Sequence, residues 1–383
     1  HENLEAMELL KHLNSVMKKR NPGVFMIAEE STAWPKITGK VEEDGLGFDL
    51  KWNMGFMNDF LTYIGYDPYF RAHHHNELTF SMIYAYSENF MLVFSHDEVV
   101  HGKSTMIGKM PGVLEDKFAN LRLTYAYMMT HPGKKLLFMG QDIAEFKEFD
   151  EMRETEWGLL SCDGHKGVHE LIKDLNKLYK EKPALYALDT HPEGFEWINC
   201  ISPEKCMVSF LRKTQKKNDT LVVAVNFANA EQEFVIGVPY EGKYMEILNT
   251  DDERYGGLGR VNGEAKFAEE VEIDGKPYSF KMMSAPLSAS IFTYTPYNEE
   301  ERKQIARKKR ILAAEKKAEE AKEEAVLAVE NAKLLRKDAE EAKAEAREAE
   351  KKAETAEKKA AEAQKKAEEE QKKAEAMRAE QEA

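Results

Sequence analysis

Three short apolar runs, separated by segments with helical spacing, constrain the fold of this chain more than any other feature. The runs cover residues 24–28, 91–94 and 136–139, and polar side chains follow each of them directly. Because the runs are continuous rather than alternating, we expect strands covered on both faces, as in parallel sheets between helices. The chemistry of such folds collects at the carboxyl edge of the sheet. No glycine-rich phosphate loop follows a strand, so a (β/α) barrel is favoured over a nucleotide-binding open sheet.

The pattern changes at about Tyr186, which we take as the end of the α/β unit at residues 1–185. Short strands then alternate with turns, and Asp274-Gly275 is a hairpin-type turn. This spacing predicts an antiparallel β-sandwich as a second domain at 186–297. The expected strands are 195–200, 207–212, 220–226, 233–238, 244–248, 270–273 and 288–294.

A third segment, residues 298–383, is rich in alanine, glutamate and lysine and contains neither proline nor glycine. Its apolar residues, nearly all alanine, step by four and three without a slip from Ala314 to Ala367, which predicts one long α-helix with a heptad seam. Alanine buries little area, so we expect at most weak self-association through this seam. Mixed charge at i,i+4 spacing can also hold a lone helix in water.

Charge and cysteine content limit which partners and which cellular compartment are expected. The formal net charge is −14, and nearly all of it lies before Glu299, so nucleic acid is not expected as a partner. The cysteines Cys162, Cys200 and Cys206 form no CxxC pattern, which indicates a reducing compartment. We find no membrane-spanning run and no signal peptide, and therefore expect a cytoplasmic location. Because the sequence opens at His1 directly within an amphipathic segment, we expect a partial chain.

Two of the expected strand ends carry residues suited to acid–base chemistry on a sugar. Glu29 follows the first run, where partial desolvation would suit a general acid; an acid that caps the next helix is the competing interpretation. His96 and Asp97 follow the second run. An aspartate there can stabilise an oxocarbenium-like transition state and a histidine can donate to a sugar hydroxyl, although a local pair that only shapes the loop remains the alternative.

The histidine run at 73–75 invites a metal hypothesis that the sequence does not favour. Adjacent histidines on one strand or loop point in different directions, and no HExxH helix is present. We therefore expect neither a metal nor another cofactor.

Several motifs resemble the branching enzymes of the α-amylase superfamily, and bacterial glycogen branching enzymes most closely. Residues 26–32, Met-Ile-Ala-Glu-Glu-Ser-Thr, resemble the third conserved region of that family. Residues 95–104, Ser-His-Asp-Glu-Val-Val-His-Gly-Lys-Ser, are similar to its fourth region with a characteristic extension. The resemblance extends over residues 1–297, with further similar segments at 51–59, 74–76, 78–81, 87–90, 107–112, 117–122, 137–142, 247–251 and 255–257.

The resemblance implies the C-terminal half of a (β/α)8 TIM barrel, an all-β domain and a retaining transfer of α-1,4 glucan to a 6-hydroxyl of glycogen. It implies that Glu29 is the general acid/base, Asp97 the transition-state-stabilising carboxylate and His96 a substrate-binding residue. The strand before Asp97 would be two further round the barrel from the strand before Glu29.

Two departures from the family pattern stand out. The chain has Gln141-Asp142 where the family usually has Gln-Glu. The family's nucleophile lies in a Gly-Phe-Arg-x-Asp type motif, which this sequence does not contain. We therefore expect the nucleophile to be absent from this chain and the chain to be inactive alone.

Two other functions remain open at this stage. The first is an amylase-type hydrolase of the same superfamily, against which the extended fourth region argues. The second is a non-catalytic, glucan-associated scaffold protein whose helical tail carries its function. The missing nucleophile leaves this second function open.

Overall fold

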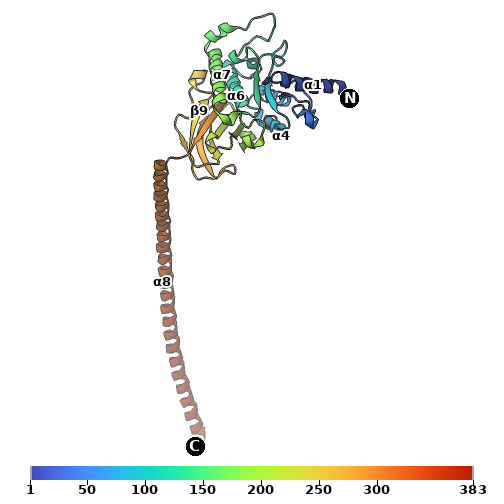
Figure 1. Ribbon diagram of the computed structural model, residues 1–383. Coiled ribbons are helices and arrows are strands. Elements are labelled where there is room, and N and C mark those ends of the chain that lie inside the picture. The colour runs from blue at the N-terminus through green and yellow to red at the C-terminus, as the bar shows by residue number, and fades with distance from the viewer. Residues whose placement is uncertain (1, 382–383) are drawn as a thin grey trace. The chain divides into compact units, whose positions relative to one another are not determined.

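The computed structural model describes residues 2–381, and side-chain surroundings as far as residue 376. The chain divides into two compact units, His1–Tyr297 and Asn298–Ala383. The first unit combines a parallel sheet, antiparallel strands and the helices around them (Figure 1). Among the described residues, no helix combines the length and the apolar character needed to cross a membrane.

The parallel sheet has four strands that lie side by side in chain order: β1 (Ile27–Ala28), β2 (Leu50–Asn53), β3 (Phe90–Phe94) and β4 (Lys134–Leu137). All three neighbouring pairs are parallel. Three strands fall on the three apolar runs. The run pattern alone missed β2, because Lys51 and Asn53 interrupt it with polar side chains, although the family resemblance implied a strand between those of Glu29 and Asp97.

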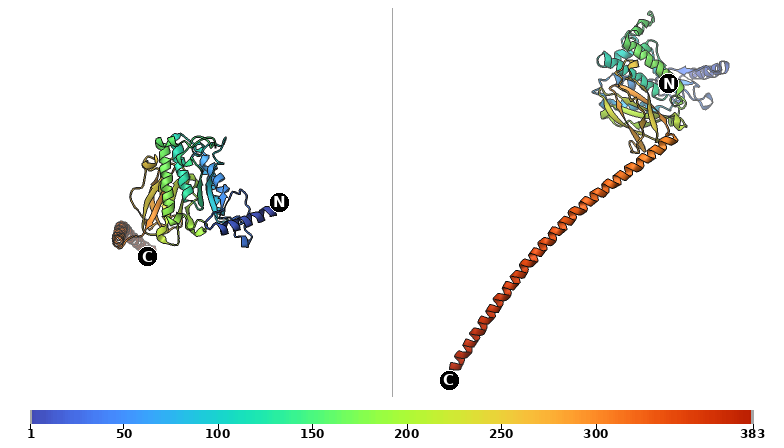
Figure 2. Two further views of the ribbon diagram at one scale, coloured as in Figure 1. Left: turned by 45° about the horizontal axis from the view of Figure 1, so that its top comes forward. Right: turned by 90° about the vertical axis from the view of Figure 1, so that its left-hand side faces the viewer.

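Helix α6 (Leu114–Thr130) is buried on almost every side, and every residue from Asn120 to Thr130 is buried. It packs against α7 and against strands of the antiparallel sheet, while its Tyr127 ring lies 4.8 Å from Phe60. In the left view of Figure 2 the green helices lie between the blue strands and the orange ones. The other helices of this unit are α1 (Leu4–Arg20), α2 (Met54–Gly65), α3 (His75–Thr79), α4 (Ser81–Tyr84), α5 (Met106–Lys109) and α7 (Asp163–Glu181).

The C-terminal part of the first unit is all-β and antiparallel. Its six-stranded sheet has the order β10-β9-β12-β7-β6-β5, and β8 and β11 form a separate pair. Apolar side chains of both layers, among them Val222, Phe234, Phe280 and Phe292, share one core. The strands are β5 (Phe195–Asn199), β6 (Met207–Arg212), β7 (Leu221–Asn226), β8 (Gln232–Val238), β9 (Lys243–Asn249), β10 (Lys266–Phe267), β11 (Tyr278–Ser284) and β12 (Ser288–Thr295).

The antiparallel all-β architecture expected from sequence is therefore confirmed, with one strand misplaced. Residues 270–273 form no strand, and the expectation there was wrong. The turn at Asp274 and Gly275 is present, with positive φ at both residues, but the long strand that follows it, β11, was missed. β11 pairs with β8 along its whole length, so long-range pairing decides which segment becomes a strand.

Three buried arginines connect the α/β part of this unit to its antiparallel part through backbone carbonyl groups. Their guanidinium groups donate as follows: Arg71 to Phe227 at 2.8 Å, Arg122 to Thr250 at 2.9 Å, and Arg212 to Thr130 at 2.7 Å. Burial lowers the pKa of Arg71 and of Arg122 to about 10, so both stay charged at neutral pH. Arg212 also forms an ion pair of 2.7 Å with the buried carboxylate of Asp189.

We expect Arg212→Met to lower the free energy of unfolding by about 3 kcal/mol, because the buried Asp189 would lose its 2.7 Å ion pair and keep only its contacts with Lys134 and Tyr179. Chemical denaturation of the purified chain measures this change. Arg254→Met is the matched control, since its side chain is 63% exposed and its ion pairs lie in water, where they contribute less than about 1 kcal/mol. Equal losses in both variants would contradict the assignment of Arg212 as a structural tie.

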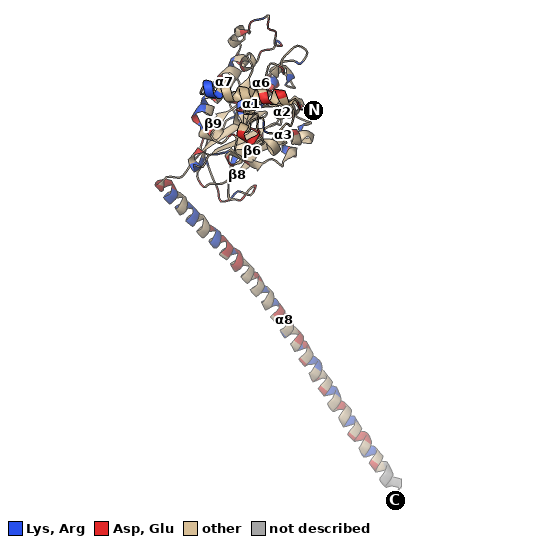
Figure 3. Ribbon diagram, turned by 45° about the vertical axis from the view of Figure 1, so that its right-hand side comes forward, with Lys and Arg blue, Asp and Glu red and all other residues tan. Residues whose placement is uncertain are grey.

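The second unit is one helix, α8 (Glu299–Gln381). Asn298 caps it: the Glu301 N–H donates to the Asn298 side chain, and the Glu301 carboxylate accepts from the Asn298 N–H. Figure 3 shows acidic and basic residues interleaved along the part of this helix that is coloured. Its side chains from 306 to 376 are exposed, including Val326, Leu327 and Leu335. The long helical tail expected from sequence is confirmed.

Deleting residues 298–383 should leave the melting temperature of the first unit within about 1–2 °C of the full chain, because α8 buries almost no side-chain surface. Calorimetry on the two proteins tests this. A drop of 5 °C or more would show that the helix stabilises the first unit.

Candidate functional site at the carboxyl edge of the parallel sheet

Glu29 lies directly after β1, and its side chain is exposed. Alternation along the strand directs Ile27 and Glu29 to one face and Ala28 and Glu30 to the other. Ala28 is buried against Ile37 and Leu46, whereas Ile27 is 40% exposed. The expected partial desolvation of Glu29 is therefore wrong for this structure, because the face that Glu29 shares with Ile27 is largely uncovered.

Glu30 is held firmly by its neighbours. Its carboxylate forms an ion pair of 2.8 Å with Lys51 and accepts from the Thr32 N–H at 2.8 Å. Burial raises the pKa of Glu30, but the Lys51 and Thr32 hydrogen bonds outweigh that effect and the net shift is downward. Lys51 is itself buried, with a side chain 5% exposed, and also donates to the Thr32 carbonyl at 2.7 Å. Glu30 is thus a structural counter-ion of a buried lysine.

We expect Glu30→Gln to cost about 1.5–3 kcal/mol of unfolding free energy and Glu29→Gln to cost less than about 0.5 kcal/mol. The Glu30 contribution should be complete above its unfolded pKa of 4.5 and be lost as pH falls through its lower folded pKa. Denaturation of both variants at pH 7 and pH 3 measures this. A larger loss for Glu29→Gln would show that the two carboxyl groups have been interchanged.

At the end of β3, His96 and Asp97 are both exposed. The His96 ring lies 6.0 Å from the ring of Phe138, which follows β4. The Asp97 carboxylate forms an ion pair of 3.0 Å with Lys103. The next residue, Glu98, is buried and turns back to accept from the Ser95 N–H. This turn leaves His96 and Asp97 projecting from the edge of the sheet.

Two residues that the sequence did not single out clamp the 98–104 loop. Lys109 donates to the Glu98 carbonyl at 2.7 Å and to the Lys103 carbonyl, and burial lowers its pKa. On the other side, the Glu148 carboxylate accepts from the N–H groups of Gly102 and Ser104 at 3.0 and 2.6 Å. These hydrogen bonds lower the pKa of Glu148. The loop that carries Lys103 is therefore fixed from both ends.

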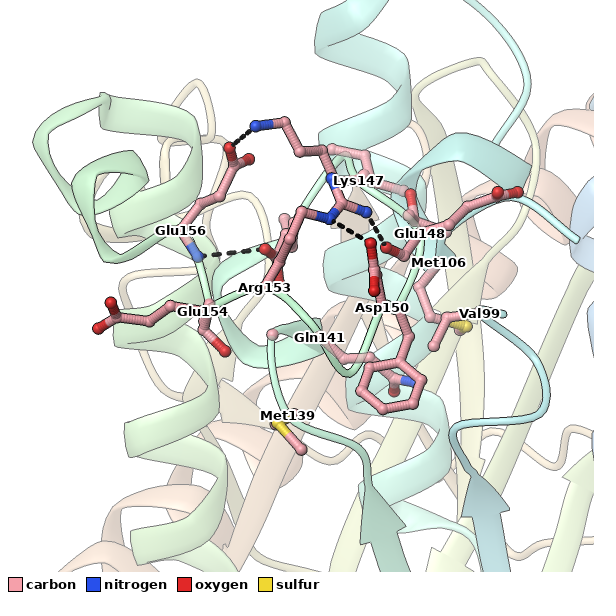
Figure 4. Close-up of a pocket in the computed structure, with 17 residues that line it drawn as sticks. Val99, Met106, Met139, Gln141, Lys147, Glu148, Asp150, Arg153, Glu154 and Glu156 are labelled. Atoms are coloured by element: carbon pink, nitrogen blue, oxygen red, sulfur yellow. Dashed lines mark hydrogen bonds and ion pairs between the residues drawn. The ribbon is translucent and has the colours of Figure 1, made fainter. Parts of the chain in front are cut away.

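A cleft opens beside this loop, between residues 99–107 and 139–156. Figure 4 shows Arg153 reaching Asp150 and the backbone of Glu148, while Lys147 contacts Glu156. Both cations on the wall of this cleft, Lys147 and Arg153, are thus already paired with carboxylates of the same wall.

The departure at Gln141-Asp142 is accommodated locally. Gln141 is buried and donates to the Ser95 carbonyl at 3.2 Å, which ties the end of β4 to the end of β3. Asp142 pairs with His169 of α7 at 3.3 Å. Neither side chain is needed to explain the exposure of His96 and Asp97.

Two of the histidines at 73–75 make separate structural contacts. His75 Nε2 lies 2.7 Å from the Cys200 carbonyl, and His74 lies against Glu77 and the Tyr66 ring. Within residues 2–381 we find no group of three or more His, Cys, Asp or Glu side chains arranged to hold a metal ion.

The first similarities to known proteins concern the fold. Residues 197–295 match the family described as alpha amylase, C-terminal all-beta domain. Among solved structures, the chain is similar to AmyP in complex with maltose (11% identity, TM-score 0.54, 76% of this chain and 62% of that one) and to a debranching enzyme of Nostoc punctiforme (14%, TM-score 0.53, 74% and 55%). At such identities these likenesses show the fold alone.

The closer similarity is to branching enzymes. The chain is 46% identical over 292 residues to the 1,4-alpha-glucan branching enzyme GlgB of Geobacillus stearothermophilus, covering 76% of this chain and 46% of that protein. It is 47% identical over 288 residues to the GlgB of Aquifex aeolicus, covering 75% and 46%. The resemblance to branching enzymes of the α-amylase superfamily is thereby confirmed. The chain spans about half the length of these relatives.

Proposed function

We propose that residues 1–185 form half of a (β/α)8 barrel and residues 186–297 its companion β-sandwich domain. The strand order supports the barrel: β1 to β4 advance in one direction without the reversal that defines a doubly wound sheet. Right-handed crossovers in that order put all the connecting helices on one face, as in a barrel wall. The opposite face, with Ile27 and Glu29, would then face the barrel interior.

We propose that the chain acts in the branching of α-1,4 glucan, with Glu29 as general acid/base, Asp97 as transition-state stabiliser and His96 as a substrate-binding residue. Glu29 would protonate the departing glycosidic oxygen and later accept the proton of the attacking 6-hydroxyl. Asp97 would offset positive charge at the anomeric carbon. The observation that carries this proposal is the exposure of all three side chains at the carboxyl ends of β1 and β3.

The proposal leaves the nucleophile outside this chain. Neighbouring strands lie about 4.8 Å apart, so the strands of Glu29 and Asp97, with β2 between them, lie roughly 10 Å apart. A retaining pair of carboxyl groups needs a separation of about 5–5.5 Å. Asp97 therefore does not suit the nucleophile's position opposite Glu29.

The remaining assignments follow from the same proposal. The partner is an α-1,4 glucan or glycogen, and a cytoplasmic location agrees with three unpaired cysteines. An uncharged polymer also suits a chain whose formal net charge is −14.

We expect residues 1–383 alone to form no α-1,6 branches on amylose, measured by iodine staining and by branch counting after debranching. Release of reducing sugar, assayed in parallel, distinguishes a hydrolase. Branching by this chain that Glu29→Gln and Asp97→Asn each abolish would show that it contains a nucleophile and that our assignment of that role is wrong.

If the chain is joined to the N-terminal half of a related branching enzyme, Glu29→Gln should lower branching by about 10³-fold or more, because proton transfer and leaving-group departure depend on it. Glu30→Gln at a temperature well below its melting point is the matched control and should retain activity. A dead Glu30 variant beside an active Glu29 variant would refute the assignment.

A further inference from the structure

The large apolar side chains of α8 gather in two short clusters within an otherwise charged helix. Ile311 and Leu312 of the first cluster are 51% and 69% exposed, and every member of the second is between 56% and 69% exposed. Single exposed apolar residues need no partner, whereas clusters of this kind mark an interaction surface. The proximal cluster consists of Ile305, Ile311 and Leu312, and the distal cluster of Val326, Leu327, Val329, Leu334 and Leu335.

The alanine seam of α8 indicates what kind of partner covers these clusters. The seam keeps its heptad spacing from Ala314 to Ala363, which is seven heptads. On a straight helix such a line turns by about 20° per heptad, or roughly 140° over this stretch. It stays on one side only when the helix supercoils with another helix of the same repeat. The longest described helix of the first unit, α7, has 19 residues and is too short to reach both clusters, so the matching helix is α8 of a second copy.

Packing and charge both favour an antiparallel pair. Alanine at the seam positions lets two helix axes approach closely. In a parallel pair Leu335 would meet Leu335 of the second copy, and Ile311 would meet Ile311, which forces the axes apart at these layers. A parallel pair would also bring together two copies of the 302–317 segment, each with eight basic side chains and one acidic side chain. An antiparallel pair avoids both conflicts.

The apolar clusters and the charges select the same antiparallel register. When Ala318 lies opposite Ala321 of the second copy, the proximal cluster of each helix lies against the distal cluster of the other. In this register no like-charged pair flanks the seam between residues 303 and 338. The oppositely charged pairs that flank it, all of them exposed side chains, are Lys317 with Glu324, Glu315 with Lys322 and Lys303 with Asp338 of the second copy.

We propose that two copies of this chain associate through α8, as an antiparallel pair over residues 299–340 with Ala318 of each copy opposite Ala321 of the other. The two-fold axis crosses the pair between Glu319 and Glu320, so the interface is self-complementary. The paired segment is about 63 Å long, and the two first units are attached at its opposite ends. The rest of α8, from residue 341 onward, extends beyond the paired segment.

Sedimentation equilibrium of residues 1–383 over a wide range of concentrations tests the proposal, and a monomer–dimer equilibrium is the expected result. Lys317→Glu places like charges beside the seam on both sides of the two-fold axis and should weaken the dimer about threefold or more, while adding Glu324→Lys should restore it. In a parallel pair Lys317 flanks Lys322, so the same substitution would strengthen the dimer. Lys351→Glu, the same charge change outside the paired segment, is the matched control and should leave the affinity unchanged.

Disulfide trapping tests the register directly. Ile311→Cys and Ala328→Cys, each made in a chain that also carries Cys162→Ser, are mixed and oxidised, because Cys162 is itself exposed. Ile311 lies opposite Ala328 of the second copy in the proposed register, so the crosslinked dimer should contain one chain of each variant. Circular dichroism confirms that every variant keeps its helix content.

Four results would each overturn the proposal. They are a monomer at every concentration, a dimer that survives deletion of residues 298–383, a tighter dimer in Lys317→Glu, and trapping of Ile311→Cys with itself. The proposal does not depend on the branching assignment, which the branch-counting assays judge separately.

Discussion

The burial of three guanidinium groups between the sheets is the constraint on which the rest of the structure depends. Each group would be very costly to bury alone, and each is stabilised by backbone carbonyl groups from the opposite part of the unit. Arg212, which is 0% exposed, needs both its ion pair with Asp189 and its hydrogen bond to the C-terminal end of α6. Because these bonds form only when α6 lies between the sheets, the helix side of the parallel sheet is covered next to β3 and β4.

That covering has a consequence for chemistry. With α6 and the antiparallel strands against one face next to β3 and β4, the carboxyl edge of the parallel sheet stays open there. The side chains that emerge there, Glu29 and Asp97, are the exposed ones, while the acids directly after them are held inside: Glu30 by Lys51 and Glu98 by the Ser95 N–H. At both strand ends, Glu-Glu and Asp-Glu, the first carboxylate is thus exposed and the second is held by a structural contact.

The sequence predicted the elements whose periodicity is local and missed those decided by long-range partners. Apolar runs located β1, β3 and β4, and alternation located most of the antiparallel strands. The apolar pattern did not reveal β2, because this strand contains the charged residue Lys51. In the structure Lys51 is buried as the ion-pair partner of Glu30. Similarly, Lys109 and Glu148 clamp the loop beside Asp97, yet Glu148 lies 44 residues from Ser104, and no short motif connects them. Glu29 and Asp97 were singled out at strand ends, and the family resemblance implied their roles, which stay predictions. The desolvation expected for Glu29 was wrong because β1 is a sheet edge.

The exposure of Glu29 bears directly on the role proposed for it. A general acid must hold its proton at neutral pH, and proteins achieve this by surrounding the carboxyl group with apolar or anionic neighbours. The Glu29 side chain is exposed, and Ile27 on the same face is 40% exposed, so the described residues give Glu29 little cover. If Glu29 is the general acid, as proposed above, the cover that it needs would come from a substrate or from structure added on this face. On that proposal the carboxyl group becomes an effective acid only when the face is covered, and the edge stays inert until then.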